Sequence, residues 1–203
     1  MGKLKAIYIL LSVLLFAFTS CEDTVEVSEY DNWQERNIAF IDSIATVARA
    51  NNDGKWKVFP TTGLDESKEH GNEFNVYCYV LQAGDGTEHP AYNDTVKVNY
   101  SGRLIPSKSY PKGYLFDSSY DGELEPEFDV PVEFGLAGTV PGFCTAVQHM
   151  VAGTTSASGD IWRVYIPADL GYGAKASSGV PAYSALVFEI NLVSFRAVGT
   201  KKE

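Results

Sequence analysis

Apolar residues recur at every second position through much of the chain after residue 73. In the run 74–81, Val76 and Cys78 lie on one face, and Tyr77 and Tyr79 lie on the other. A period of two predicts β-strands, and a strand that is apolar on both faces is expected to be covered on both sides. Further strand-like runs cover residues 95–104, 114–117, 130–136, 160–166 and 184–195. The second part of the chain is therefore predicted to consist mainly of β-sheet.

A long helix is predicted ahead of these strands, over residues 31–51. Asp31 is the expected N-cap, and Gln34 follows at the spacing of a capping box. Apolar residues recur along this segment every three or four positions, at Ile38, Phe40, Ile41, Ile44, Ala45, Val47 and Ala48. The Asn-Asn-Asp-Gly sequence at 51–54 tolerates left-handed backbone and is expected to end the helix. The apolar side must be buried on the following domain or in a homodimer, and the sequence leaves both options open.

A second, short helix is predicted among the strands. Pro141 and Gly142 begin it, and Phe143, Val147 and Met150 mark its inner side. The predicted fold class is therefore α+β, with an antiparallel sheet that curls around one short helix and an N-terminal helix added to it.

The first residues have the pattern of an export signal. Lys3 and Lys5 precede an apolar run at 6–18, which is too short to cross a hydrocarbon core of about 30 Å as a helix. The run ends in Phe18-Thr19-Ser20-Cys21, which resembles a bacterial lipobox except for the aromatic residue at 18. We expect residues 1–20 to be a lipoprotein signal peptide and Cys21 to carry a lipid that anchors the chain to the bacterial cell envelope, at the periplasmic face or cell surface of the outer membrane. The alternatives are a secretory signal with an incidental cysteine and an uncleaved anchor.

Charge and cysteine content limit the classes of partner and scaffold. The chain has 16 Lys and Arg against 26 Asp and Glu, a formal net charge of −10, which argues against nucleic acid as the main partner. Three cysteines are too few for a disulfide scaffold. With Cys21 lipidated, Cys78 and Cys144 either pair or remain buried thiols. Their strand-like and helix-like surroundings favour free thiols.

An acidic segment stands out between two of the predicted strands. Its carboxylates alternate with other residues, at Asp121, Glu123, Glu125, Glu127 and Asp129. Such a segment is most simply a solubilising edge, and the alternative is that it selects basic segments of a partner polypeptide.

Six short motifs occur in an order that is typical of one protein family. They are Val-Asn-Tyr-Ser-Gly at 98–102, Leu-Phe-Asp-Ser-Ser at 115–119, Pro-Val-Glu-Phe at 131–134, Val-Pro-Gly-Phe at 140–143, Leu-Gly-Tyr-Gly at 170–173 and Ala-Leu-Val-Phe-Glu-Ile at 185–190. Together they resemble the FKBP family of peptidyl-prolyl cis-trans isomerases, with the core match over residues 94–195. The expected division of the chain is a signal peptide at 1–20, a tether and helix at 21–73, an FKBP-like domain at 74–197 and a tail at 198–203.

The resemblance implies a half-barrel sheet wrapped around the short helix, with an aromatic pocket for a proline ring. The residues that it implies for catalysis are Tyr100, Phe116, Asp117, Val140, Phe143, Tyr172 and Phe188. The residues that it implies for substrate binding are Val132, Phe134 and Val180. In this family pattern the Val140 N–H and the Tyr172 hydroxyl hold the substrate carbonyl, and Asp117 is a polar anchor for pocket side chains.

The activity implied is rotation about X-Pro peptide bonds in proline-containing segments of exported proteins. Because no bond is made or broken, the reaction requires no metal and no cofactor. Two positions depart from the family pattern, since Phe143 replaces a tryptophan and Val132 replaces a phenylalanine. These changes reshape the expected pocket. The alternative function is therefore an FKBP-fold binding module or chaperone with weak or no isomerase activity.

Overall fold

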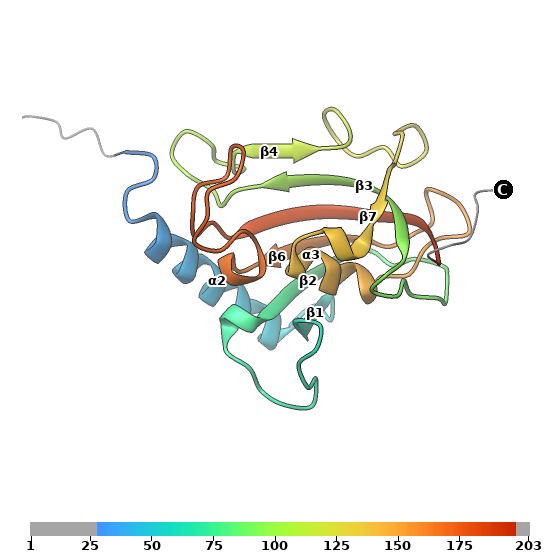
Figure 1. Cartoon of the computed structure of the whole chain (residues 1–203), viewed down its shortest axis with the longest axis horizontal. Coiled ribbons are helices and arrows are strands. Elements are labelled where there is room, and N and C mark those ends of the chain that lie inside the picture. Colours follow the sequence, from blue (N-terminus) through green and yellow to red (C-terminus); the bar gives the residue numbers. More distant parts are fainter. Residues whose placement is uncertain (1–27, 198–203) are drawn as a thin grey trace, which may run out of the picture. The chain divides into compact units, whose positions relative to one another are not determined.

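The computed structural model describes residues 28–197 (Figure 1). The predicted signal peptide, the lipidation site at Cys21 and the predicted tail at 198–203 lie outside the described residues. None of the helices within residues 28–197 has the length and apolar character needed to span a bilayer.

One antiparallel sheet forms the centre of the molecule. Its strands are β1 (Trp56–Pro60), β2 (Asn75–Gln82), β3 (Thr95–Arg103), β4 (Leu115–Ser118), β5 (Val132–Gly135), β6 (Ile161–Ile166) and β7 (Leu186–Arg196). Their order is β1-β2-β6-β7-β3-β4, and β5 pairs with β3 beside this path. In Figure 1 the short helix α3 (Pro141–Gln148) lies in front of the curved sheet. The predicted α+β fold with an antiparallel sheet and a short helix is confirmed.

The two helices cover opposite faces of the sheet. On β6, Tyr165 contacts Phe40 of α2 (Trp33–Ala50), with ring centroids 6.1 Å apart. The next residue, Ile166, packs so closely on Gly142 of α3 that a Cβ at Gly142 would lie 2.3 Å from it. Because neighbouring strand residues point to opposite faces, α2 and α3 lie on different sides. Strand β2 contacts both helices, which explains why both of its faces are apolar.

Strand β1 is an element that the sequence pattern did not predict. The stretch is only five residues long and has no clear alternation, because four of its five side chains are partly buried. It pairs with β2, and Trp56 stacks on Tyr165 with ring centroids 5.7 Å apart. The sheet therefore begins at Trp56, ahead of the domain start that was expected at residue 74.

The predicted start of the long helix is wrong. Helix α2 begins at Trp33, and its N-cap is Asn32, which has left-handed backbone with φ 50° and no capping side-chain bond. Asp31 instead accepts a hydrogen bond from the backbone N–H of Ser28 through Oδ2 at 3.1 Å, so it closes a turn before the helix. The predicted end is confirmed, since Asn51 adopts the left-handed conformation that stops the helix.

The buried side of α2 also differs from the predicted stripe. The buried residues are Trp33, Asn37, Ile41, Ala45 and Ala48, which repeat every three or four positions. Ile38 and Val47 were expected on this side, but they are 56% and 53% exposed. The predicted stripe is off centre because the buried side begins with Trp33 and the polar residue Asn37, which the apolar pattern did not include. It contacts β1, β2 and β6, so the helix packs on its own domain.

Both cysteines in the described chain are free thiols. Cys78 lies in β2 and Cys144 in α3, and both are buried. Burial raises the pKa of the Cys144 thiol to about 11 and also raises the pKa of the Cys78 thiol. This arrangement agrees with the expectation of two unpaired, inert thiols.

Candidate functional site

A pocket of about 430 Å³ opens beside the N-terminus of α3. Residues from four strands, the short helix and two loops line it: Tyr100, Asp117, Phe134, Gly135, Gly138, Thr139, Val140, Phe143, Tyr172 and Phe188. Five of these ten residues are aromatic, and polar groups such as the Asp117 carboxylate and the tyrosine hydroxyls lie among them. Such a composition is typical of small-molecule and side-chain binding pockets.

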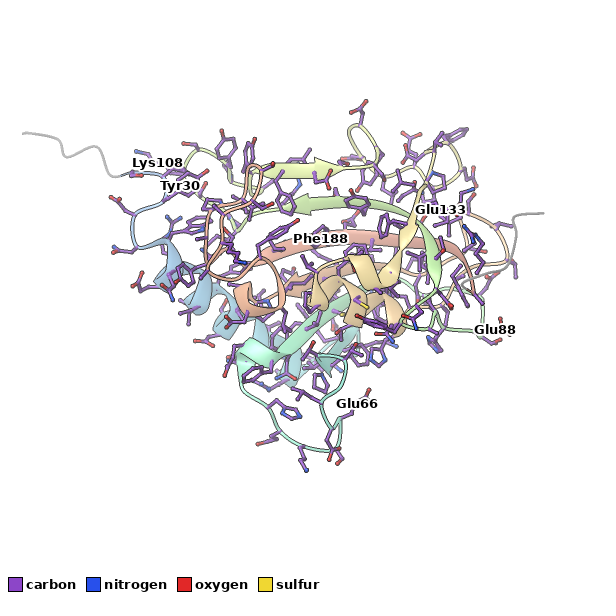
Figure 2. The ribbon with its side chains drawn as sticks, in the orientation of Figure 1. Tyr30, Glu66, Glu88, Lys108, Glu133 and Phe188 are labelled. Atoms are coloured by element: carbon purple, nitrogen blue, oxygen red, sulfur yellow. The ribbon has the colours of Figure 1, made fainter. Side chains whose placement is uncertain are left out.

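Aromatic rings in edge-to-face contact form the pocket walls and floor. Phe143 of α3 is only 3% exposed, and its ring lies 5.2 Å from that of Phe188, at an interplanar angle of 81°. Tyr100 meets Phe143 at 6.1 Å and 81°, and Phe134 meets Phe143 at 5.9 Å. Phe188 lies on β7 in the middle of the sheet (Figure 2). Because each ring is held by others at favourable angles, the apolar surface of the pocket is preformed.

One hydrogen bond ties the aromatic wall to the polar rim. The hydroxyl of Tyr100 on β3 donates to Oδ2 of Asp117 on β4 at 2.7 Å. Burial, and then this hydrogen bond, raise the pKa of Tyr100, so the phenol stays protonated and keeps donating. Asp117 is therefore placed as an acceptor that orients the tyrosine ring, which fits the anchoring role expected from the sequence.

A backbone N–H group lies at the opposite edge of the pocket. Val140 is the N-cap of α3, and the N–H groups at a helix N-terminus lack partners within the helix. Pro141 has no N–H of its own, so the Val140 N–H is the first donor at this end. The positive end of the helix dipole adds to its attraction for a carbonyl oxygen.

Tyr172 supplies a hydroxyl on the loop that follows the 3-10 helix η3 (Ala168–Leu170). Its side chain is 38% exposed and lines the pocket. Gly173, the next residue, has φ 61°, a conformation that favours glycine, and its N–H donates to the carbonyl of Ala168 at 2.8 Å. This turn sets the direction in which the chain leaves Tyr172.

A glycine that sequence analysis did not select shapes the pocket wall. Gly102 on β3 lies opposite Phe188 on β7. A Cβ at this position would lie 2.6 Å from Cζ of Phe116 and 2.7 Å from Cε1 of Phe188. Both distances are shorter than real Cβ contacts, so the two rings occupy the space that the glycine leaves. The Val-Asn-Tyr-Ser-Gly motif contains this glycine, and that was the available signal.

The ten predicted site residues do not all line the pocket. Seven do: Tyr100, Asp117, Phe134, Val140, Phe143, Tyr172 and Phe188. Phe116 is not among the lining residues but contacts one of them, since its ring lies 5.7 Å from that of Phe188 at an interplanar angle of 89°. Val132 is partly exposed on β5, opposite Val98, and Val180 is buried in the loop after Tyr172, where it pairs with Ser177.

Three lining residues were not among the predictions. Gly135, Gly138 and Thr139 come from the end of β5 and the 3-10 helix η2 (Leu136–Gly138). These residues lie between the Pro-Val-Glu-Phe and Val-Pro-Gly-Phe motifs, so neither motif includes them. Within the described part of the chain, no group of three or more His, Cys, Asp and Glu residues is placed to hold a metal ion.

Comparison with known protein families matches residues 86–193, just over half of the chain, to the family described as FKBP-type peptidyl-prolyl cis-trans isomerase. The chain is 38% identical over 118 residues to the peptidyl-prolyl cis-trans isomerase Mip of Coxiella burnetii, covering 58% of this chain and 43% of that protein. It is 32% identical over 148 residues to the isomerase FkpA of Escherichia coli, covering 72% of this chain and 47% of that protein. The chain thus spans somewhat less than half the length of these two relatives.

Solved structures give the same fold. A crystal structure of a peptidyl-prolyl cis-trans isomerase from Pseudomonas syringae matches with a TM-score of 0.51 and 26% identity, over 78% of this chain and 95% of that one. The family match covers β3 to β6, most of β7, α3 and every residue that lines the pocket. The chain therefore belongs to the family of FKBP-type peptidyl-prolyl cis-trans isomerases.

Proposed function

We propose that this chain is a peptidyl-prolyl cis-trans isomerase whose substrate is a proline-containing polypeptide segment. The observation that carries the proposal is the pocket itself. It combines an aromatic floor centred on Phe143 with the Val140 N–H and the Tyr172 side chain at its edge. An apolar ring and a neighbouring carbonyl are the two groups that an X-Pro bond presents together.

The reaction that this pocket has to catalyse is rotation about one bond, the C–N bond before proline, which has partial double-bond character. The barrier to that rotation is about 18–20 kcal/mol, and uncatalysed exchange takes tens of seconds. A planar amide is more dipolar than a twisted one, so a dry aromatic pocket favours the twisted form relative to the planar form. Lowering the barrier by about 5–6 kcal/mol would accelerate exchange roughly 10⁴-fold.

The polar groups hold one side of the bond while the other side turns. The proline ring packs on Phe143, Phe188 and Phe134, and the flanking carbonyl accepts hydrogen bonds from the Val140 N–H and the Tyr172 hydroxyl. Tyr100 and Asp117 keep the wall in place through their 2.7 Å hydrogen bond. In this scheme no side chain of the pocket acts as a nucleophile or a general base.

A protease-coupled assay tests this function. A protease that cleaves only the trans form of an X-Pro peptide reports the rate at which cis converts to trans. We expect residues 22–203 to accelerate that rate in proportion to protein concentration. A folded protein that leaves the rate unchanged would reject the isomerase and favour the binding-module alternative, which peptide binding without turnover would then identify.

We propose further that the chain acts in the bacterial cell envelope, anchored through lipid on Cys21. The basic residues, the apolar run at 6–18 and the position of Cys21 support this. One relative, from Legionella longbeachae, is named outer membrane protein MIP and is 34% identical over 118 residues, which are 58% of this chain. Metabolic labelling with a radioactive fatty acid should mark the full chain but not its Cys21→Ser variant. Equal labelling of both would overturn the anchor, and protease treatment of intact cells would separate the surface from the periplasmic face.

A homodimer through the N-terminal helix would have to use the outer side of α2. Its buried side already packs on the sheet, whereas Ile38 and Val47 are exposed on the outer side. Sedimentation equilibrium of residues 22–203 tests the homodimer. The mass of one chain excludes it, and a doubled mass that Ile38→Glu returns to one chain supports it.

A further inference from the structure

The first turn of α2 is hydrogen bonded to the loop that begins at Tyr172. The indole Nε1–H of Trp33 donates to Oγ of Ser184 at 2.8 Å. The backbone N–H of Ala185 donates to Oδ1 of Asn37 at 2.8 Å. Both bonds join residues that are about 150 positions apart in the sequence, and all four residues are buried.

These groups belong to one buried network. The Ser184 hydroxyl that accepts from Trp33 also donates to the carbonyl of Pro181 at 2.7 Å. The side-chain amide of Asn37 donates to the carbonyl of Trp33 at 2.6 Å, so the orientation of its oxygen toward Ala185 is fixed. Removing one partner would leave a buried polar group unpaired, which costs more than the bond itself gains.

The same loop segment is joined to the residue beside Tyr172. The N–H of Tyr183 donates to the carbonyl of Gly173 at 2.8 Å, which closes the loop at its base. Tyr183 has φ 61°, an uncommon conformation for a bulky residue, which surrounding contacts must maintain. Its neighbour Ser184 is the residue that Trp33 holds. The loop base is therefore fixed on one side by α2 and on the other by the backbone next to Tyr172.

Helix α2 is itself firmly attached to the sheet. Ile41, Ala45 and Ala48 are buried against it, and Phe40 packs on Tyr165 of β6. The helix is thus a rigid support, on which a hydrogen bond can hold a loop more precisely than contacts within the loop alone.

We propose that α2 positions the active-site loop, with Trp33 and Asn37 acting as positioning residues for the Tyr172 hydroxyl. This inference rests on the proposed isomerase function and assigns a role in it to a helix outside the region that matches the family. Neither residue lines the pocket. The influence of both on catalysis therefore passes through residues 183–185 and reaches the substrate only at Tyr172.

The test is a set of variants measured in two backgrounds. Trp33→Phe removes one donor and keeps an aromatic ring, Ser184→Ala removes the acceptor of the same bond, and Asn37→Leu removes the acceptor for Ala185. In the otherwise unchanged chain, each is expected to lower kcat/KM for an X-Pro peptide by about 3- to 10-fold, the loss typical of one hydrogen bond. Because Ser184→Ala also removes the bond to the Pro181 carbonyl, the Trp33→Phe and Ser184→Ala changes combined should cost no more than Ser184→Ala alone.

In the Tyr172→Phe background, the same changes are expected to lower kcat/KM by less than about 2-fold, because the hydroxyl that they position is already absent. Equal fold-losses of kcat/KM in both backgrounds would mean that the variants act by general destabilisation, and this result would overturn the inference. Asp42→Ala is the matched control, because it removes an exposed hydrogen bond from Asn72 to the same helix and none of the bonds to residues 172–185. It should leave kcat/KM unchanged in both backgrounds.

Hydrogen exchange separates this inference from the proposed function. The Tyr183 and Ala185 amides should exchange at least about 3-fold faster in Trp33→Phe and Asn37→Leu than in the unchanged chain or Asp42→Ala. Unchanged exchange at these amides would overturn the positioning role. An unchanged chain without isomerase activity would overturn the proposed function alone, and the exchange rates would still show whether α2 holds the loop.

Discussion

At the scale of single residues, the site depends on a few side chains whose positions other residues determine. Tyr100 is held by Asp117, Phe188 fits opposite a glycine, and the Val140 N–H is available because it lies at a helix end. Seven of the ten residues that the motifs selected line one pocket, and their roles in the reaction remain predictions. The motifs did not reveal Gly135, Gly138 or Thr139, because these residues lie between the Pro-Val-Glu-Phe and Val-Pro-Gly-Phe motifs.

Tyr100→Phe is expected to lower kcat/KM by about 3- to 10-fold, because the ring loses the bond to Asp117 that orients it. The free energy of unfolding should fall by only about 1 kcal/mol, since Asp117 can turn to solvent. Peptide turnover and urea denaturation measure the two quantities. Unchanged turnover would show that the hydrogen bond does not position the wall, and Tyr110→Phe, an exposed tyrosine, is the control.

Gly102→Ala is expected to disturb the pocket by displacing the ring of Phe188, which lines it. The added methyl group would lie 2.6 Å from Phe116 and 2.7 Å from Phe188, so both rings must move. We expect an overpacking cost of about 1–3 kcal/mol in stability and a rise in KM for proline peptides larger than the change in kcat. A matched Gly138→Ala change, where no atom lies within 4 Å of the added methyl, should cost less stability. Equal stability losses would contradict this explanation.

At the scale of elements, the sequence pattern predicted six strands of the described chain, the four-residue strands β4 and β5 among them, and missed β1. Strands β2, β3, β6 and β7 were predicted to within a few residues, because alternation over six or more positions is distinctive. The short strand β1 has no alternation and owes its conformation to pairing with β2. The buried face of α2 includes Asn37, a polar residue that the apolar pattern cannot predict. It is buried because its side chain accepts a hydrogen bond from the Ala185 N–H.

The end of α3 is joined to the segment around β1 by a stacked histidine. The ring of His149 lies 3.8 Å from that of Phe59 and nearly parallel to it. Thr62, two residues after β1, also donates its N–H to the hydroxyl of Thr145 in α3 at 3.0 Å. Burial lowers the pKa of His149, and Glu66, 3.8 Å away on the loop after β1 (Figure 2), opposes this shift. Lys57 and His89 lower the pKa further.

This pKa predicts how stability depends on pH. The folded chain binds the His149 proton less readily than the unfolded chain, whose histidine has its ordinary pKa of about 6.5. The stability contributed by the neutral ring is therefore complete above about pH 6.5 and is lost as pH falls from there toward the lower folded pKa. His149→Phe should flatten the fall in unfolding free energy between pH 7.5 and 5.5. An unchanged slope in His149→Phe would contradict the assignment.

At the scale of the whole molecule, one sheet supports two helices with different tasks. Helix α3 lies within the family match and brings Val140 and Phe143 to the pocket. Helix α2 lies before the match and packs on the opposite face, where it reaches the loop after Tyr172. The sequence could predict that α2 would need a partner surface. It could not predict which surface, because a periodic apolar face is compatible with any apolar partner.

The reactivity of the two buried thiols measures whether this core is folded. In residues 22–203, Cys78 and Cys144 should not react with a thiol reagent at pH 8 while the protein is folded, because both are buried and burial raises the pKa of each. Unfolding without a reductant should release both thiols for reaction. Fewer than two reactive thiols in the unfolded chain would show that the cysteines pair.

The proposed function depends on rotation of an X-Pro bond inside the pocket, which magnetisation-exchange NMR measures without a protease. A peptide with resolved cis and trans signals exchanges over tens of seconds by itself. With a small fraction of the folded protein added, we expect exchange fast enough to give cross-peaks between the two signals within about a second, and weaker cross-peaks with Tyr172→Phe. Peptide signals that shift or broaden on binding, with no exchange between cis and trans, would contradict it.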